Sequence, residues 1–230
     1  IITASGDRFF SAGHRIGNKP VDEADKDSEP KVEEAPSRAR GVFWPQSGTA
    51  TKWGTTSSPM GGHDGYPEIW KPVIGAINGW VAGWAFGFLL SSTDIRIACE
   101  EHARFKYGLL SLGGIGGTPI PTLLPRQIAY ADAMKILLTD EPFDAREALR
   151  ISLINEVVPH PQLMERAEEI ATHIATNVPP VAVRMVKEFA RRFSDIPVSE
   201  AWRVQHLMGS LVNTLTTDQE EGRKAFREKR

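Results

Sequence analysis

The sequence predicts an α/β fold, and three observations lead to that prediction. Short apolar segments that alternate like strands are interleaved with segments of helical periodicity, which is the pattern of strands and helices packed in layers. A run of 20 residues, 73–92, carries no charged side chain. Beyond residue 128 most of the chain has helical periodicity with apolar side chains on one face. With 230 residues, the chain is long enough for one main core and a smaller appendage.

The charge-free run, 73–92, has two interpretations. About 20 apolar residues can cross a bilayer, and glycines at four-residue spacing would suit helix packing there. The other interpretation is favoured, because Asn78-Gly79 is typical of a turn, the apolar residues before it suit a buried strand, and Gly83–Ser92 suits a buried helix. We therefore expect no membrane span, but a strand, a turn and a helix whose first amides point at whatever occupies the turn.

The remaining elements follow from the same patterns. Residues 1–4 and 94–99 are expected to be strands, and the segment 18–65, acidic and proline-containing in its first half, is expected to be a long mobile loop. The glycine-rich segment 111–119 has neither a phosphate-loop nor a dinucleotide-binding motif. We expect a core over 1–157 and a C-terminal helical segment over 158–230. The patterns predict a strand over 153–157 and helices over 129–138, 144–151, 162–177, 180–193, 199–212 and 218–229.

Composition narrows the class of function. The formal net charge of −2 gives no basic footprint, so nucleic acid is not an expected partner. The single cysteine, Cys99, cannot form an internal disulfide and lies in an apolar strand pattern, so we expect a buried thiol and a reducing, cytoplasmic setting. The N-terminus lacks the layout of a secretory signal, and because the chain opens with Ile1 inside an apolar run, we expect it to be a fragment.

Two common catalytic constellations do not occur in the sequence. The six histidines are scattered and the single cysteine has no partner at ligand spacing, so no metal is expected. No Gly-x-Ser-x-Gly motif occurs, which leaves Ser11, Ser111 and His63 as weak candidates for chemistry. Two loops, 11–15 and 82–85, each deliver small residues and backbone amides after an apolar strand. Such amides can bind an oxyanion, an effect worth about 3 to 4 kcal/mol per donor in known enzymes.

Four segments of the chain carry recognisable motifs in one order. They are IITASGDRFFSAGHRI, KPVIGAINGWVAGWAFGFLLSSTDIRIACEEHARF, LLPRQIAYADAMKILLTDEPFDAREALRISLINEVVP and EEGRKAFREKR. The first is similar to a strand followed by F-[CSA]-A-G-x-[DH]-[LI], with Arg15 at the [DH] position, and the second is similar to K-P-[VI]-[IV]-A-x-[IV]-N-G…D-[IL]-x-[IV]-A…A-x-F, with Gly75 at the alanine position. Together they resemble the enoyl-CoA hydratase/isomerase (crotonase) superfamily over nearly the whole chain.

The resemblance implies a fold, a substrate and an assembly. The fold is a crotonase-type spiral of β-β-α turns with a C-terminal helical trimerisation segment, so a homotrimer or homohexamer is expected. The substrate is an acyl-CoA thioester. Coenzyme A therefore arrives as part of the substrate, and no separate cofactor is implied.

The resemblance also places the site. Family chemistry passes through an enolate whose oxygen is held by two backbone amides, and the matching positions here are His14 and Trp84. Because this chain has one residue more than the usual spacing, Ala85 is the alternative to Trp84. The substrate-binding positions that accompany them are Ala12, Gly13, Gly83 and Leu109.

Two positions depart from the hydratases of the family. Their two glutamates correspond here to Gly87 or Phe88 and to Leu109, so both carboxylates are absent. Water addition needs a general base and acid near the reacting carbons, so we expect an enzyme of this family that is not a standard hydratase. The alternative is a catalytically silent CoA-binding or assembly protein. Weaker candidates for a substitute acid or base are His14, His63, Asp64, Glu68 and Tyr107.

Overall fold

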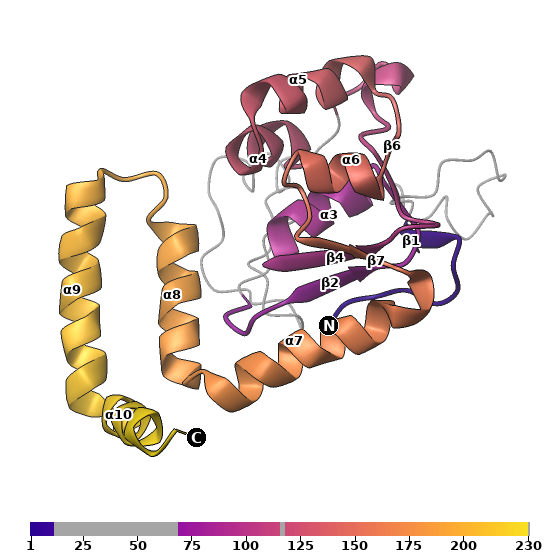
Figure 1. Cartoon of the computed structure of the whole chain (residues 1–230). Helices are drawn as coiled ribbons and strands as arrows, with labels where there is room; N and C mark the ends of the chain where they lie inside the picture. Colours follow the sequence, from indigo (N-terminus) through magenta and orange to yellow (C-terminus); the bar gives the residue numbers. More distant parts are fainter. Residues whose placement is uncertain (12–68, 116–117, 230) are drawn as a thin grey trace, which may run out of the picture. The chain divides into compact units, whose positions relative to one another are not determined.

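The computed structural model describes residues 1–11, 69–115 and 118–229 (Figure 1). The chain divides into two compact units. The first comprises Ile1–Ile69 and Val73–Ala167, and the second comprises Trp70–Pro72 and Glu168–Arg230. The loop predicted over 18–65 lies outside the described residues.

The first unit contains two β-sheets (Figure 1). One consists of three parallel strands in the order β2 (Ile74–Ile77), β4 (Ile95–Cys99) and β7 (Glu156–Val158). The other has the order β1 (Phe9–Ser11), β3 (Trp80–Ala82), β5 (Arg104–Lys106) and β6 (Phe143–Asp144). Its first three strands are parallel, and β6 is antiparallel to β5. All four residues of β2 are buried, as expected of a strand covered on both faces.

Strands and helices follow one another as β-β-α turns. β2 and β3 are separated only by Asn78-Gly79 and lie in different sheets, and α3 (Trp84–Ser92) follows them. β4 and β5 repeat this step from one sheet to the other and lead to α4 (Ile120–Gln127). The predicted α/β fold is therefore confirmed, and its repeat is the β-β-α turn of the expected spiral.

The helices predicted after residue 128 are confirmed, with ends within three residues of those expected. Two 3-10 turns, 110–112 and 160–162, were not expected. The helices are α5 (Tyr130–Thr139), α6 (Ala145–Arg150), α7 (Leu163–Asn177), α8 (Pro180–Arg192), α9 (Val198–Leu215) and α10 (Asp218–Glu228).

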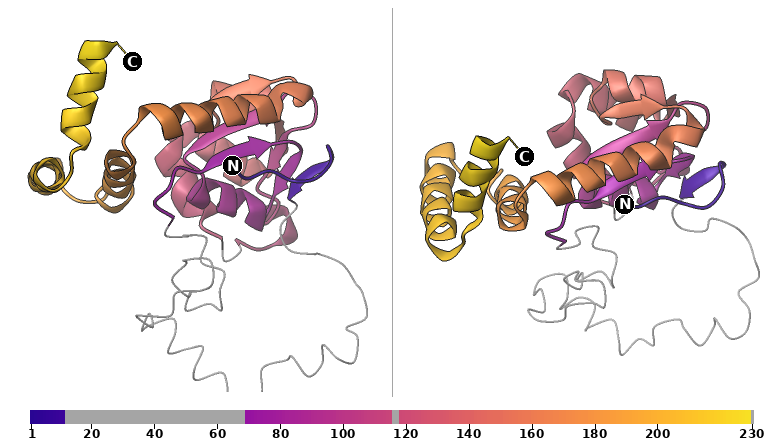
Figure 2. Two further views of the ribbon diagram at one scale, coloured as in Figure 1. Left: turned by 90° about the horizontal axis from the view of Figure 1, so that it is seen from below. Right: turned by 60° about the horizontal axis from the view of Figure 1, so that its bottom comes forward.

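Other elements differ from the predictions for physical reasons. The strand expected over 1–4 is a single bridge, in which Ile2 exchanges two backbone hydrogen bonds of 2.8 Å with β2, beside which the N-terminal segment lies (Figure 2). The strand expected over 153–157 is β7, which begins at Glu156. α4 was not predicted because it contains two prolines, one of them, Pro125, inside the helix.

An aromatic cluster holds α3 against the second sheet. Phe86 of α3, Phe105 of β5 and Phe143 of β6 contact one another, with ring centroids 5.3 to 6.3 Å apart. Phe86 and Phe105 are completely buried. Burying a side chain of this kind contributes about 1.5 to 3 kcal/mol. The cluster therefore fixes α3 relative to the end of β5.

A buried arginine fixes the other end of α3. Arg96, in β4, is 8% exposed. Its guanidinium donates to the Thr93 hydroxyl (2.8 Å), the Leu153 carbonyl (3.0 Å), the Leu90 carbonyl (3.3 Å) and the Gln127 side-chain oxygen (2.8 Å). A cation near the last carbonyls of a helix is favoured by the helix dipole. The guanidinium therefore joins the ends of α3 and α4 to the turn before β7.

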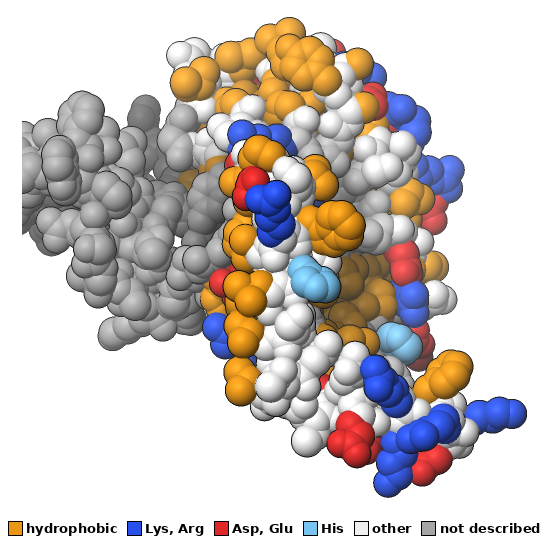
Figure 3. Space-filling view, turned by 90° about the vertical axis from the view of Figure 1, so that its left-hand side faces the viewer, with side chains coloured by type: hydrophobic (Ala, Val, Ile, Leu, Met, Phe, Trp, Pro, Cys, Tyr) orange, Lys and Arg blue, Asp and Glu red, His pale blue; other side chains and the backbone are white. Residues whose placement is uncertain are grey.

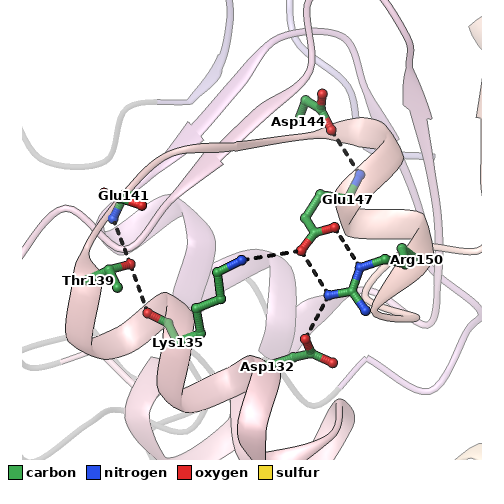
Figure 4. Close-up of polar contacts among 7 residues, drawn as sticks. All are labelled: Asp132, Lys135, Thr139, Glu141, Asp144, Glu147 and Arg150. Atoms are coloured by element: carbon green, nitrogen blue, oxygen red, sulfur yellow. Dashed lines mark hydrogen bonds and ion pairs between the residues drawn. The ribbon is translucent and has the colours of Figure 1, made fainter.

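Charged side chains on the surface connect α5 and α6 (Figure 4). Arg150 donates to Glu147, its neighbour on α6, at 2.6 Å and to Asp132 of α5 at 2.7 Å. Lys135 of α5 lies 3.9 Å from Glu147. Asp144 caps the start of α6 by accepting the Glu147 amide at 2.8 Å. Exposed pairs of this kind contribute little to stability.

The predicted buried thiol is found in β4. Cys99 is completely buried, and burial raises its pKa above the ordinary value, although backbone hydrogen bonds from His102 and Ala103 oppose the shift. A protonated, enclosed thiol is a poor nucleophile.

The charge-free run forms β2, β3 and α3, and none of the helices in the described ranges has the length and apolarity to cross a membrane.

The second unit consists of helices with few buried side chains. Lys187 of α8 is 8% exposed, and its ammonium donates to the Lys71 carbonyl at 2.7 Å. Phe189 and Phe193 stack at 4.8 Å. Within the described part of α9 and α10, by contrast, no side chain is buried. Apolar side chains of this unit therefore remain exposed.

Replacing Arg96 with lysine is expected to lower the free energy of unfolding by about 1 to 3 kcal/mol, since lysine cannot reach the same four acceptors and leaves buried carbonyls without donors. Urea denaturation followed by circular dichroism measures the change. Arg104→Lys is the control, because Arg104 donates to the neighbouring Ala103 carbonyl at its own strand end. It should change stability by less than about 0.5 kcal/mol. Equal losses in both variants would contradict the role given to Arg96.

Candidate functional site

The segments that the sequence singles out leave from the carboxyl ends of three adjacent parallel strands. Ser11 ends β1, Ala82 ends β3 and Lys106 ends β5, and the strands pair in that order. Ser11 pairs with Val81, and Ala82 pairs with Lys106. The chain therefore enters residues 12–14, the start of α3 and the loop carrying Leu109 from one edge of one sheet. The carboxyl edge of parallel strands is where α/β proteins commonly bind ligands.

Gly83 makes the turn from β3 into α3. Its φ of 57° and ψ of −128° belong to a region that side-chain-bearing residues rarely adopt. Intrahelical bonding begins with the Phe86 amide, which donates to the Gly83 carbonyl at 3.0 Å. The amides of Trp84 and Ala85 precede it and point beyond the start of the helix, where the helix dipole favours negative charge.

The loop after β5 contacts this turn. The Gly83 amide donates to the Lys106 carbonyl at 3.3 Å. Gly108 has a φ of 71°, and a Cβ added there would lie 3.7 Å from the Gly83 nitrogen. Leu109 follows and begins a 3-10 turn over Leu110–Leu112. The loop that contains Leu109 therefore lies beside the turn that contains Gly83.

The two positions that carry glutamates in hydratases of the family are Gly87 or Phe88 and Leu109, and none of these residues has a carboxylate. Gly87 faces α4, where an added Cβ would lie 3.0 Å from Pro119 and 3.2 Å from Thr118. A side chain at 87 therefore requires Pro119 and Thr118 to give way. Phe88 is half-buried and stacks on Trp84 with ring centroids 5.6 Å apart. The side chains of Trp84 and Phe88 therefore form an aromatic pair at the start of α3.

Some of the weaker candidates from the sequence lie in the described part of the structure, and others do not. Tyr107 is 2% exposed, and its hydroxyl donates to the Ile115 carbonyl at 2.7 Å. Burial and the nearby Asp140 charge raise its pKa, so it stays protonated at neutral pH. Ser111 is exposed. Several predicted site residues lie outside the described ranges, so their roles remain predictions: Ala12, Gly13, His14, His63, Asp64 and Glu68.

The sequence analysis overlooked Asp140. It ends α5, and its carboxylate accepts the amides of Gly108 at 2.5 Å and Ser111 at 2.8 Å. The signal available was an aspartate at a helix end, directly before Glu141-Pro142. Nothing in the local pattern indicates its partners, which are 32 and 29 residues away.

Comparisons with known proteins find related sequences. A family model described as enoyl-CoA hydratase/isomerase matches residues 64–230. (E)-Benzylidenesuccinyl-CoA hydratase from Thauera aromatica is 38% identical over 175 residues, which span 73% of this chain and 66% of that protein. Carnitinyl-CoA dehydratase from Citrobacter koseri is 31% identical over 239 aligned positions, which span 100% of this chain and 78% of that protein.

Solved structures give the same result. The crystal structure of an enoyl-CoA hydratase subunit from Geobacillus kaustophilus has a TM-score of 0.71 at 25% identity, covering 100% of this chain and 77% of that chain. Enoyl-CoA hydratase from Bacillus anthracis has a TM-score of 0.70 at 27% identity, covering 99% and 77%. The chain belongs to the enoyl-CoA hydratase/isomerase family, and the resemblance drawn from the sequence is confirmed.

Gly83→Ala is expected to destabilise the fold by about 1 to 3 kcal/mol, because a Cβ strains the backbone at this φ and ψ. Urea unfolding monitored by tryptophan fluorescence measures the loss. Gly222→Ala in α10 is the matched control, since an added Cβ there meets no atom within 4 Å. That control should be neutral or stabilising by up to about 1 kcal/mol. A tolerated alanine at 83 would show that the turn into α3 does not need glycine.

Proposed function

We propose that this chain is an acyl-CoA-processing enzyme that stabilises a thioester enolate and is not a standard hydratase. The observation that carries the proposal is the common edge of β1, β3 and β5. From it leave the segment with His14, the turn with Trp84 and the loop with Leu109. Membership of the family supports a thioester substrate, and the names of the relatives, a hydratase and a dehydratase of CoA esters, support the same class.

The proposed chemistry uses backbone amides. In the proposal the thioester oxygen accepts hydrogen bonds from the amides of His14 and Trp84, with Ala85 as the alternative to Trp84. As the proton at the α carbon is removed, negative charge develops on this oxygen, and each fixed donor contributes about 3 to 4 kcal/mol in known enzymes. The positive end of α3 adds to the stabilisation. Coenzyme A enters as part of the substrate.

Standard hydration is disfavoured by the residues around these amides. A hydratase must place a carboxylate where water attacks, and residues 83–88 and 107–113 contain no Asp or Glu. Gly87 lies against Pro119 and Thr118, which a longer side chain would have to displace. Asp140 is the acidic residue in contact with the second segment, and its oxygens bind backbone amides. Isomerisation, decarboxylation and C–C cleavage need the oxyanion site but not this carboxylate pair.

The first test is hydration of crotonyl-CoA, measured as the loss of enoyl-thioester absorbance. We expect it to be weak or undetectable, because a missing general acid/base typically costs about 10² to 10⁴ in rate. Leu109→Glu should restore little, since the partner carboxylate is also missing and the two act together. Titration calorimetry with crotonyl-CoA and free CoA runs in parallel. Ordinary hydration by the unmodified chain would refute the proposal. If neither crotonyl-CoA nor free CoA binds the folded protein, the result would favour a silent assembly protein.

We also propose that copies of the chain assemble as a homotrimer or homohexamer through the second unit. Large apolar side chains are exposed along α9, including Trp202 at 70% and Leu215 at 77%. Figure 3 shows hydrophobic side chains exposed at the surface. A groove of about 500 Å³ between α8 and α9 is lined largely by apolar residues, among them Phe189 and Met208. Exposed apolar surfaces of this kind are typical of protein interfaces.

Leu207→Asp on α9 is expected to shift the protein to monomers, because an unpaired charge would be buried in the interface. Leu207 is 60% exposed, so the change should leave the fold of the chain itself intact. Sedimentation velocity at micromolar concentration measures the state. Ser210→Asp is the control, since its side chain belongs to the polar face of α9. A wild-type monomer, or dissociation by both variants alike, would argue against assembly through this helix.

A further inference from the structure

The loop that carries Leu109 is clamped by a side chain from another element. Asp140 is 5% exposed and lies between Thr139 and Glu141, which Figure 4 labels. One carboxylate oxygen accepts the Gly108 amide at 2.5 Å, and the other accepts the Ser111 amide at 2.8 Å. These two amides stand on either side of Leu109 and Leu110. A single carboxylate thus fixes both ends of the turn that follows β5.

Asp140 adopts a backbone conformation that glycine adopts more easily. Its φ of 51° and ψ of 26° are left-handed, and its amide closes α5 by donating to the Ile136 carbonyl at 3.2 Å. A residue with a side chain is strained in this conformation, so other interactions must stabilise it there. The two amide bonds to the loop provide that compensation. The Asp140 side chain therefore stabilises the loop after β5 rather than the end of α5.

The carboxylate is also kept ionised. Burial raises the pKa of Asp140, but hydrogen bonds from the Ser111 side chain and from the Ser111 and Gly108 amides, with the charge of Lys106, outweigh it. The resulting pKa lies below the ordinary value. An ionised carboxylate only accepts hydrogen bonds, and its bonds to backbone amides are among the stronger ones in proteins.

We propose that Asp140 is a positioning residue that holds the loop against Gly83 and thereby sets the direction of the amides at the start of α3. The path is short: Asp140 binds Gly108, Gly108 lies against the Gly83 nitrogen, and the Gly83 amide donates to the Lys106 carbonyl. The inference rests on the proposed function, because the amides matter only if they hold a thioester oxygen.

The Asp140→Gly variant tests the positioning of the loop without destabilising the end of α5. Glycine takes the left-handed conformation without cost, so α5 should end as before while the loop loses its clamp. Hydrogen exchange of the Gly108 and Ser111 amides is expected to be about 10- to 100-fold faster. Asp140→Asn keeps one acceptor oxygen and should fall between wild type and Asp140→Gly. Asp144→Ala is the matched control, because it removes a similar aspartate-to-amide bond at the start of α6.

The functional readout is the absorbance band of cinnamoyl-CoA at saturating protein. Hydrogen bonds to the thioester oxygen draw charge toward it and shift the band to longer wavelength, so the shift reports the direction of the amides rather than affinity. We expect the wild type and Asp144→Ala to shift the band fully, Asp140→Asn partly, and Asp140→Gly little. A full shift by Asp140→Gly despite fast exchange, or unchanged exchange in that variant, would overturn the proposal. A wild type that gives no shift would refute the oxyanion site itself, and the exchange rates would then distinguish that failure from loss of the clamp.

Discussion

The buried guanidinium of Arg96 is the constraint on which the arrangement of the site depends. It fixes the last turn of α3 by binding the Leu90 carbonyl and reaches the end of α4 through Gln127. A nine-residue helix held at its C-terminal end and wedged by Phe86 near its start has no freedom to slide. The position of its first amides, at the edge of the sheet, is therefore fixed by a contact about 9 Å along the helix, at a rise of 1.5 Å per residue.

The site is built mainly from backbone. Gly83 and Gly108 supply unusual backbone conformations, α3 supplies amides and a dipole, and the side chains nearby are aromatic or aliphatic. Such a site polarises a carbonyl without titrating, because amides carry no charge that changes with pH.

The sequence predicted the parts of the fold whose signals are local. The charge-free run with Asn78-Gly79 gave β2 and α3, and one-sided apolar periodicity gave α5 to α10. It missed β1, β3, β5 and β6 because two or three residues are too few to show alternation, and it missed α4 because Pro125 argues against a helix. The edge where β1, β3 and β5 end, and the clamp by Asp140, depend on pairings between distant segments. No local pattern encodes such pairings.

The scarcity of buried side chains in α9 and α10 has a consequence for how the chain unfolds. The first unit has a core that includes completely buried Phe86, Ile97 and Leu124, whereas no described side chain of these two helices is buried. Two units with such different cores need not melt together. In the isolated chain the calorimetric enthalpy of unfolding would exceed the van't Hoff enthalpy of a single cooperative transition. A single melting temperature would then describe neither unit.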